Sequence, residues 1–190
     1  IDSLAWPIAV VIIVLSLKEG VINLLPKLKQ LKYKDFQLDF EKDIRDIKVQ
    51  ADKSQLPKLE SIATHKELKE ARSSLINLCN TYPRAAIFES WTLLDAKIGS
   101  ALQNSGIITN GEKLGTLYSP TNGAEVLLGE QYLDKYNYFK ELWRIRNKIA
   151  HGITSELKIE RSIAYVEMAF RLILFIEETW PNKKINSDHK

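Results

Sequence analysis

The sequence predicts an all-α protein, a helical bundle of four to five helices preceded by an N-terminal transmembrane helix and a short juxtamembrane segment. From about residue 60 onward, apolar residues recur at intervals of three and four, the period of amphipathic helices. Residues 163–176 are apolar almost all round, which indicates a helix at the centre of the bundle. Residues 4–17 form an apolar run with lysines only after it, which is typical of a membrane anchor.

The apolar run at 4–17 is broken only by Pro7 and Ser16. As a helix it would measure about 21 Å, which is short of a hydrocarbon core of about 30 Å. Continuation to Leu25 would supply the missing length. A buried core helix is the alternative that the length alone favours, but the lysines on one side favour a single span. We therefore expect residues 1–25 to anchor the chain once in the inner (plasma) membrane, with the C-terminal part cytoplasmic.

The net charge of +3 comes from one segment of the chain. Residues 18–34 carry five lysines and one glutamate, while the charges of residues 35–190 balance. The soluble part therefore lacks the broad basic face of a non-specific nucleic-acid binder, and any RNA binding must rest on a local cluster. Cys79 is the only cysteine, which excludes an internal disulfide and a cysteine-rich zinc site. We expect no metal and no cofactor.

The same patterns predict the division of the chain. We expect a basic juxtamembrane segment and linker at 26–57, the helical domain at 58–181 and a disordered tail at 182–190. Within the linker, residues 36–40 alternate as a short strand would, and 41–52 form a charged helix with Ile44 and Ile47 on one side.

In the helical domain, Pro83 predicts the start of a helix that runs to about residue 103. Its apolar stripe is spaced by four, three and four residues, at Ile87, Trp91, Leu94 and Ile98. The other predicted elements are helical residues at 60–80, a loop at 104–122, and helices at 124–128, 130–151 and 156–179. Thr154 or Ser155 can cap the last helix, and Glu167 and Arg171 interrupt it too strongly for a second membrane span.

A polar cluster ends the predicted helix at 130–151. Asn147 and His151 share one face of that helix, whereas Arg146 lies roughly 140° from His151. Both side chains could meet one phosphate if the helix ends at His151, or if a second copy of the chain faces the first. Gly152 fits the first arrangement, because glycine commonly follows the last helical residue.

The segment Arg146-Asn147-Lys148-Ile149-Ala150-His151 resembles the R-x4-6-H motif of HEPN domains, in the bacterial form that opens with Arg-Asn. Residues 82–95 resemble the first long helix of bacterial HEPN-like proteins, and the resemblance covers about residues 60–180. It implies a metal-independent endoribonuclease in which Arg146 binds phosphate, Asn147 orients and His151 transfers protons. It also implies that two motifs meet across a homodimer.

The chemistry of RNA cleavage suits these residue types. Histidine can exchange protons near neutral pH, and arginine offers phosphate a planar, permanently charged fork. Arg144 and Lys148 are candidate RNA phosphate contacts. Asp95 flanks the apolar stripe and needs a partner, for which Arg146 is a natural choice, although a place at the solvent edge is as consistent with the pattern.

Two functions therefore follow from the sequence. The first is a membrane-tethered endoribonuclease acting on RNA in defence or stress, with an antitoxin or defence-system partner. The second is a non-catalytic HEPN module that dimerises and positions a partner at the membrane. The role of Arg146 separates these two functions. In the nuclease it binds phosphate, and in the non-catalytic module it serves as a structural strut.

Overall fold

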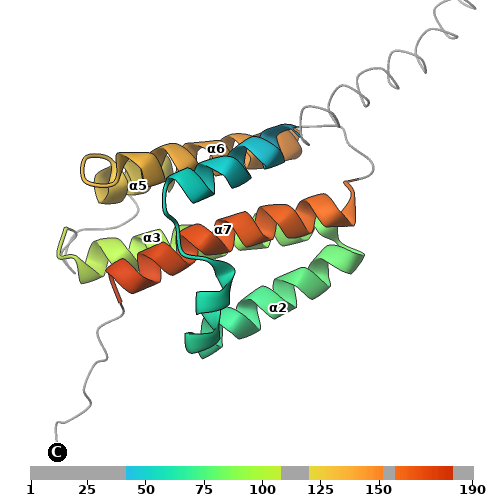
Figure 1. Ribbon diagram of the computed structural model, residues 1–190, viewed down its shortest axis with the longest axis horizontal. Helices are drawn as coiled ribbons and strands as arrows, with labels where there is room; N and C mark the ends of the chain where they lie inside the picture. The colour runs from blue at the N-terminus through green and yellow to red at the C-terminus, as the bar shows by residue number, and fades with distance from the viewer. Residues whose placement is uncertain (1–41, 108–119, 152–156, 182–190) are drawn as a thin grey trace, which may run out of the picture. The chain divides into compact units, whose positions relative to one another are not determined.

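The computed structural model describes residues 42–107, 120–151 and 157–181, and all of its secondary structure there is helical. This confirms the predicted helical bundle. The predicted membrane anchor, the strand pattern at 36–40 and the tail at 182–190 lie outside these residues. After a helical segment at 42–53 come η1 (Leu59–Thr64), α2 (Lys66–Thr81), α3 (Pro83–Asn104), α5 (Pro120–Leu128), α6 (Leu133–His151) and α7 (Ile159–Thr179) (Figure 1).

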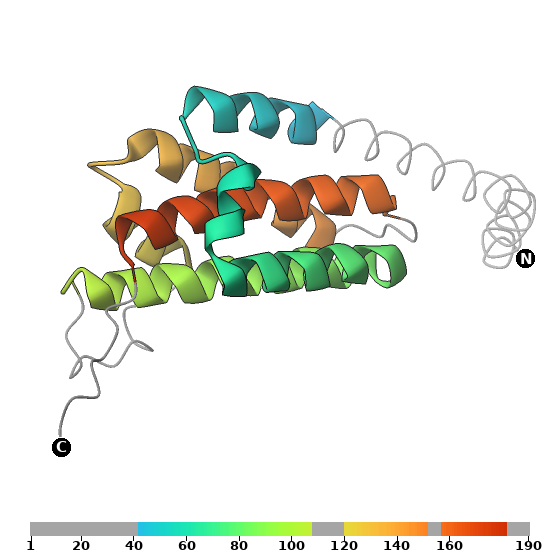
Figure 2. The same ribbon diagram turned by 60° about the horizontal axis from the view of Figure 1, so that its bottom comes forward.

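Helices α3 and α7 lie side by side and make the most extensive contact in the bundle (Figures 1 and 2). Helix α3 begins at Pro83, where the missing N–H costs no hydrogen bond, as predicted. The predicted stripe from Ile87 to Ile98 is buried along its whole length. The helix ends before Gly106, whose φ of +73° is a conformation that glycine adopts without strain.

Helix α7 lies at the centre of the bundle, as its all-round apolar pattern predicted. It contacts α2, α3, α6 and η1, and most of its residues are buried. Two buried tyrosines tie it to α6: Tyr138 donates to the Met168 carbonyl (2.9 Å) and Tyr165 to the Leu142 carbonyl (3.2 Å). Burial raises the pKa of both phenols, which therefore remain neutral donors.

The compact unit begins at Lys42, so residues 42–57 belong to it and do not form a linker outside the bundle. Ile47, Ala51 and Leu56 bury their side chains almost completely. Arg171 of α7 is only 7% exposed and holds the turn that follows the helical segment. Its guanidinium donates to the carbonyls of Leu56 (2.9 Å) and Pro57 (3.1 Å) and pairs with Asp52 (2.6 Å).

Three predicted helix starts are corrected by the structure. Helix α5 begins at Pro120 instead of residue 124, α6 at Leu133 instead of 130, and α7 at Ile159 instead of 156. The N-cap of α7 is Lys158, without a side-chain capping bond, and the predicted caps Thr154 and Ser155 lie outside the described residues. The first turn closes on the Lys158 carbonyl, which accepts from the backbone N–H groups of Arg161 and Ser162.

Candidate active site

Helix α6 runs without interruption to His151, as the sequence predicted. Leu142, Ile145 and Ile149 are fully buried and fix the rotation of the helix against the core. This rotation directs the polar residues of the last two turns away from the core. His151 is the last helical residue, and its side chain is exposed.

Arg146 turns its side chain toward the face that Asn147 shares with His151. Its Nη1 donates to Asn147 Oδ1 at 3.0 Å, and its guanidinium carbon lies 5.0 Å from the centroid of the Phe88 ring on α3. Its Nε is buried and has no hydrogen-bond partner in the part of the chain that the structure describes. The roughly 140° between Arg146 and His151 is therefore bridged in part by Asn147, without a break in the helix.

Arg84 is a residue at this site that sequence reasoning missed. Its Nη2 donates to the backbone carbonyl of Ile149, in the last turn of α6. Such carbonyls have no partner within the helix, and a cation there also opposes the negative end of the helix dipole. The start of α3 thereby holds the end of α6 beside His151. The only local signal was the position of Arg84 directly after Pro83.

Arg144 and Lys148 lie one turn apart and share a single anion, Asp43 of the helical segment 42–53. Arg144 Nη2 lies 2.7 Å from Asp43 Oδ1, and Lys148 Nζ lies 2.8 Å from Oδ2. Arg144 also pairs with Glu141 at 2.8 Å. Burial raises the pKa of the Asp43 carboxyl, but hydrogen bonds from the two cations outweigh it, so the pKa lies below its ordinary value. The predicted contacts of both cations with RNA phosphate stay predictions.

Asp95 lies further along α3 than the residues that meet the motif. Helices α3 and α6 run antiparallel, because Phe88 meets Arg146 whereas Trp91 meets Phe139 at 5.2 Å between ring centroids. Asp95 follows Trp91, about 10 Å along the helix axis from Phe88. The partners that the structure gives to Arg146 are Asn147 and Phe88.

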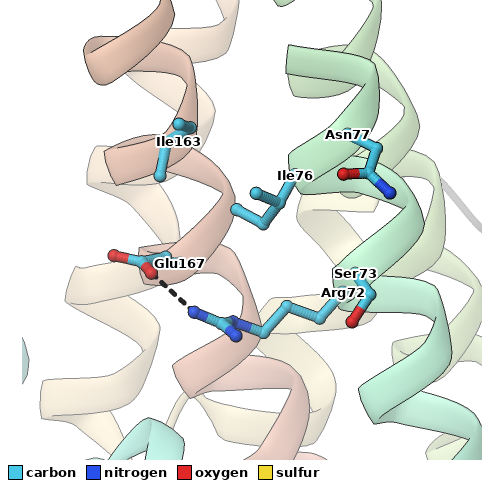
Figure 3. Close-up of a pocket in the computed structure, with 6 residues that line it drawn as sticks. All are labelled: Arg72, Ser73, Ile76, Asn77, Ile163 and Glu167. Carbon is cyan, nitrogen blue, oxygen red and sulfur yellow. Dashed lines mark hydrogen bonds and ion pairs between the residues drawn. The ribbon is translucent and has the colours of Figure 1, made fainter. Parts of the chain in front are cut away.

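A shallow pocket lies between α2 and α7, apart from the motif (Figure 3). An ion pair of 2.6 Å between Arg72 and Glu167 crosses it, and its other lining residues are Ser73, Ile76, Asn77 and Ile163. None of the predicted site residues lines it. Over the described ranges, no cluster of His, Cys, Asp and Glu suited to a metal ion is present, and no helix is long and apolar enough to cross a membrane.

Comparison with known proteins gives no match: no family model, curated protein or solved structure is similar to this chain.

The position of Asp43 predicts a pH-dependent contribution to stability. Because its folded-state pKa is lowered, the contact stabilises the fold above the unfolded-state pKa and is lost as pH falls below about 4. The free energy of unfolding of Asp43→Asn should lie below that of the wild type at neutral pH, and the gap should narrow in acid. Urea unfolding of both proteins at neutral pH and at a pH below about 4 measures this difference in free energy. The exposed Asp46, one turn along the same helix, supplies the control Asp46→Asn; an equal gap for both variants would contradict the prediction.

Proposed function

We propose that this protein is a metal-independent endoribonuclease of the HEPN type, tethered to the membrane by its N-terminal 25 residues and acting in defence or stress. One observation carries the proposal. Arg146 is directed by its hydrogen bond to Asn147 toward the face on which His151 is exposed. A guanidinium, an amide and an imidazole thus lie within the last two turns of one helix.

The proposed reaction transfers a phosphoryl group within the RNA. The 2′-oxygen attacks the adjacent phosphorus and loses its proton to a base, the bond from phosphorus to the 5′-oxygen breaks, and an acid protonates that oxygen. The products are a 2′,3′-cyclic phosphate and a 5′-hydroxyl. Each chain offers one His151 for one of the two proton transfers. A homodimer that brings two motifs together would supply both.

Arg146 is the residue that we assign to the scissile phosphate. One of its terminal nitrogens holds Asn147, and the other, Nη2, has no hydrogen-bond partner among the described residues. A guanidinium fixed by an amide and an aromatic ring loses little conformational freedom when it binds an anion, which favours binding. Arg84 would act indirectly, by holding the last turn of α6 and with it the position of His151.

The alternative function, a non-catalytic module that dimerises and positions a partner at the membrane, is favoured by a different observation. Two of the five polar residues at the end of α6, Arg144 and Lys148, already pair with Asp43 within the chain. If these cations serve to attach another segment of the same chain, their presence is explained without RNA binding. Cleavage of RNA therefore decides between the two functions.

The full chain, kept in a nonionic detergent, should cleave single-stranded RNA in the presence of EDTA. Arg146→Lys should lower the rate on the order of 10²-fold, because an ammonium cannot reproduce a two-pronged contact with the phosphate in the transition state. Cleavage is followed by gel electrophoresis of an end-labelled oligonucleotide, with the exposed Arg45→Lys as the matched control. A wild-type chain that leaves RNA intact in EDTA would refute the proposal, as would a fully active Arg146→Lys.

A further inference from the structure

We infer that Arg144 and Lys148 form a second phosphate-binding site for RNA, and that Asp43 occupies this site as an internal competitor. The inference rests on the proposed function for the identity of the anion as an RNA phosphate. The helical segment 42–53 would then restrain RNA binding until the Asp43 carboxylate moves away from the two cations.

The contact has the geometry of an occupied anion site. Each oxygen of the Asp43 carboxylate takes one cation, at 2.7 Å and 2.8 Å. The Asp43 side chain is 10% exposed, whereas those of Arg144 and Lys148 are 40% and 33% exposed. The carboxylate thus lies between the two elements while both cations still reach solvent. A phosphate offers the same pairing of oxygens with cations, and its hydrogen bonds with arginine are charge-assisted, as those of the carboxylate are.

The position of the pair on α6 places this site beside the proposed catalytic group. Arg144 lies about 20° from His151 around the helix, and Lys148 lies about 60° and 4.5 Å along the axis from it. Arg146 lies on the other side of His151, toward α3. A strand crossing the end of α6 would meet Arg146 at the scissile phosphate and the Arg144–Lys148 pair at a flanking phosphate.

The helical segment is held to the bundle by other contacts besides those of Asp43. Asp43 lies one helical turn before the buried Ile47. The rest of the segment is held independently, by the buried Ile47 and Ala51 and by the bonds of Arg171 to the turn that follows. Because the segment is tethered to the domain, its carboxylate has a high effective concentration at the pair, and RNA must displace it.

The test compares Asp43→Asn with Asp46→Asn, which removes the same charge from an exposed position on the same helix. Both are made in the full chain carrying His151→Ala, in nonionic detergent. Binding of a labelled single-stranded oligouridine is measured by fluorescence anisotropy at several salt concentrations. Two additional phosphate contacts should steepen the slope of log affinity against log salt by about 1.4 for Asp43→Asn. Between about 50 and 200 mM salt, its affinity should therefore fall about sevenfold more than that of Asp46→Asn.

Adding Lys148→Ala to Asp43→Asn should remove about half of the extra slope, since one of the two cations is lost. Equal slopes for Asp43→Asn and Asp46→Asn overturn the inference, as does an extra slope that survives Lys148→Ala. Where Asp43→Asn does not fold, Asp43→Ser takes its place in the same comparison. The proposed nuclease activity is tested separately, by RNA cleavage with the wild-type chain. If the wild type cleaves RNA but the two slopes are equal, only the second phosphate site is refuted. If the slope is steeper for Asp43→Asn but the wild type does not cleave RNA, only the nuclease function is refuted.

Discussion

His151→Ala is expected to lower the rate of RNA cleavage by about 10²–10⁴, because it removes a group that transfers a proton in the reaction. The fold should be nearly unaffected: the side chain is exposed at the end of α6, where substitutions usually change the free energy of unfolding by about 0.5 kcal/mol or less. Cleavage in EDTA and thermal unfolding of the same preparation measure the two effects.

His65→Ala is the matched control for this substitution. His65 stands at the N-cap of α2 and makes no capping bond with its side chain, so its loss should alter neither cleavage nor stability by much. A His151→Ala protein that cleaves at the wild-type rate would exclude proton transfer by this residue. Equal losses of activity in both histidine variants would point to a general effect on folding.

Arg171→Met is expected to cause the largest loss of stability among the substitutions considered. Methionine keeps most of the aliphatic stem but leaves the carbonyls of Leu56 and Pro57 without the donors that hold them. Each buried carbonyl that loses its partner costs about 1–3 kcal/mol, so the free energy of unfolding should fall by about 3 kcal/mol. For a chain of this size, that corresponds to a fall of about 6–12 °C in Tm. The ion pair with Asp52 adds little to this loss, because the Asp52 side chain is 66% exposed.

Arg72→Met is the control, because Arg72 also pairs across two helices but in a half-exposed setting. Side chains in the Arg72–Glu167 pair are 28% and 31% exposed, and such pairs contribute about 0–1 kcal/mol. Differential scanning calorimetry should therefore separate the two variants clearly. Equal, small shifts in Tm would mean that residues 51–57 do not depend on Arg171 for their attachment.

The elements of the bundle that could be predicted from the sequence are those with a local pattern. The stripe from Ile87 to Ile98, the start at Pro83 and the central position of α7 follow from helical periodicity and from proline chemistry, and all three are present. The end of α6 at His151 was predicted in the same way, from the polar cluster and the glycine after it.

The contacts that could not be predicted join residues far apart in the chain. Asp43 and Arg144 are separated by 101 residues, and Arg171 and Leu56 by 115. In the sequence, Asp43 is one charge among many in a segment that alternates acids and bases. No local rule separates it from the exposed Asp46, because only packing on α6 distinguishes them. The contact of Arg146 with Phe88 could not be predicted for the same reason, since the register of α3 against α6 decides which side chains meet.

The way in which residues 42–57 are attached also gives the domain a defined mechanical response. A pull on the chain ahead of Lys42, such as the proposed membrane anchor would transmit, reaches the partly exposed ion pairs of Asp43 first. It reaches the buried Ile47 next, and the bonds of Arg171 last. The segment would therefore detach at Asp43 first, and the bonds of Arg171, a residue of α7 itself, would carry the load last. Tension would thus be felt at the end of α6 before the bundle itself begins to open.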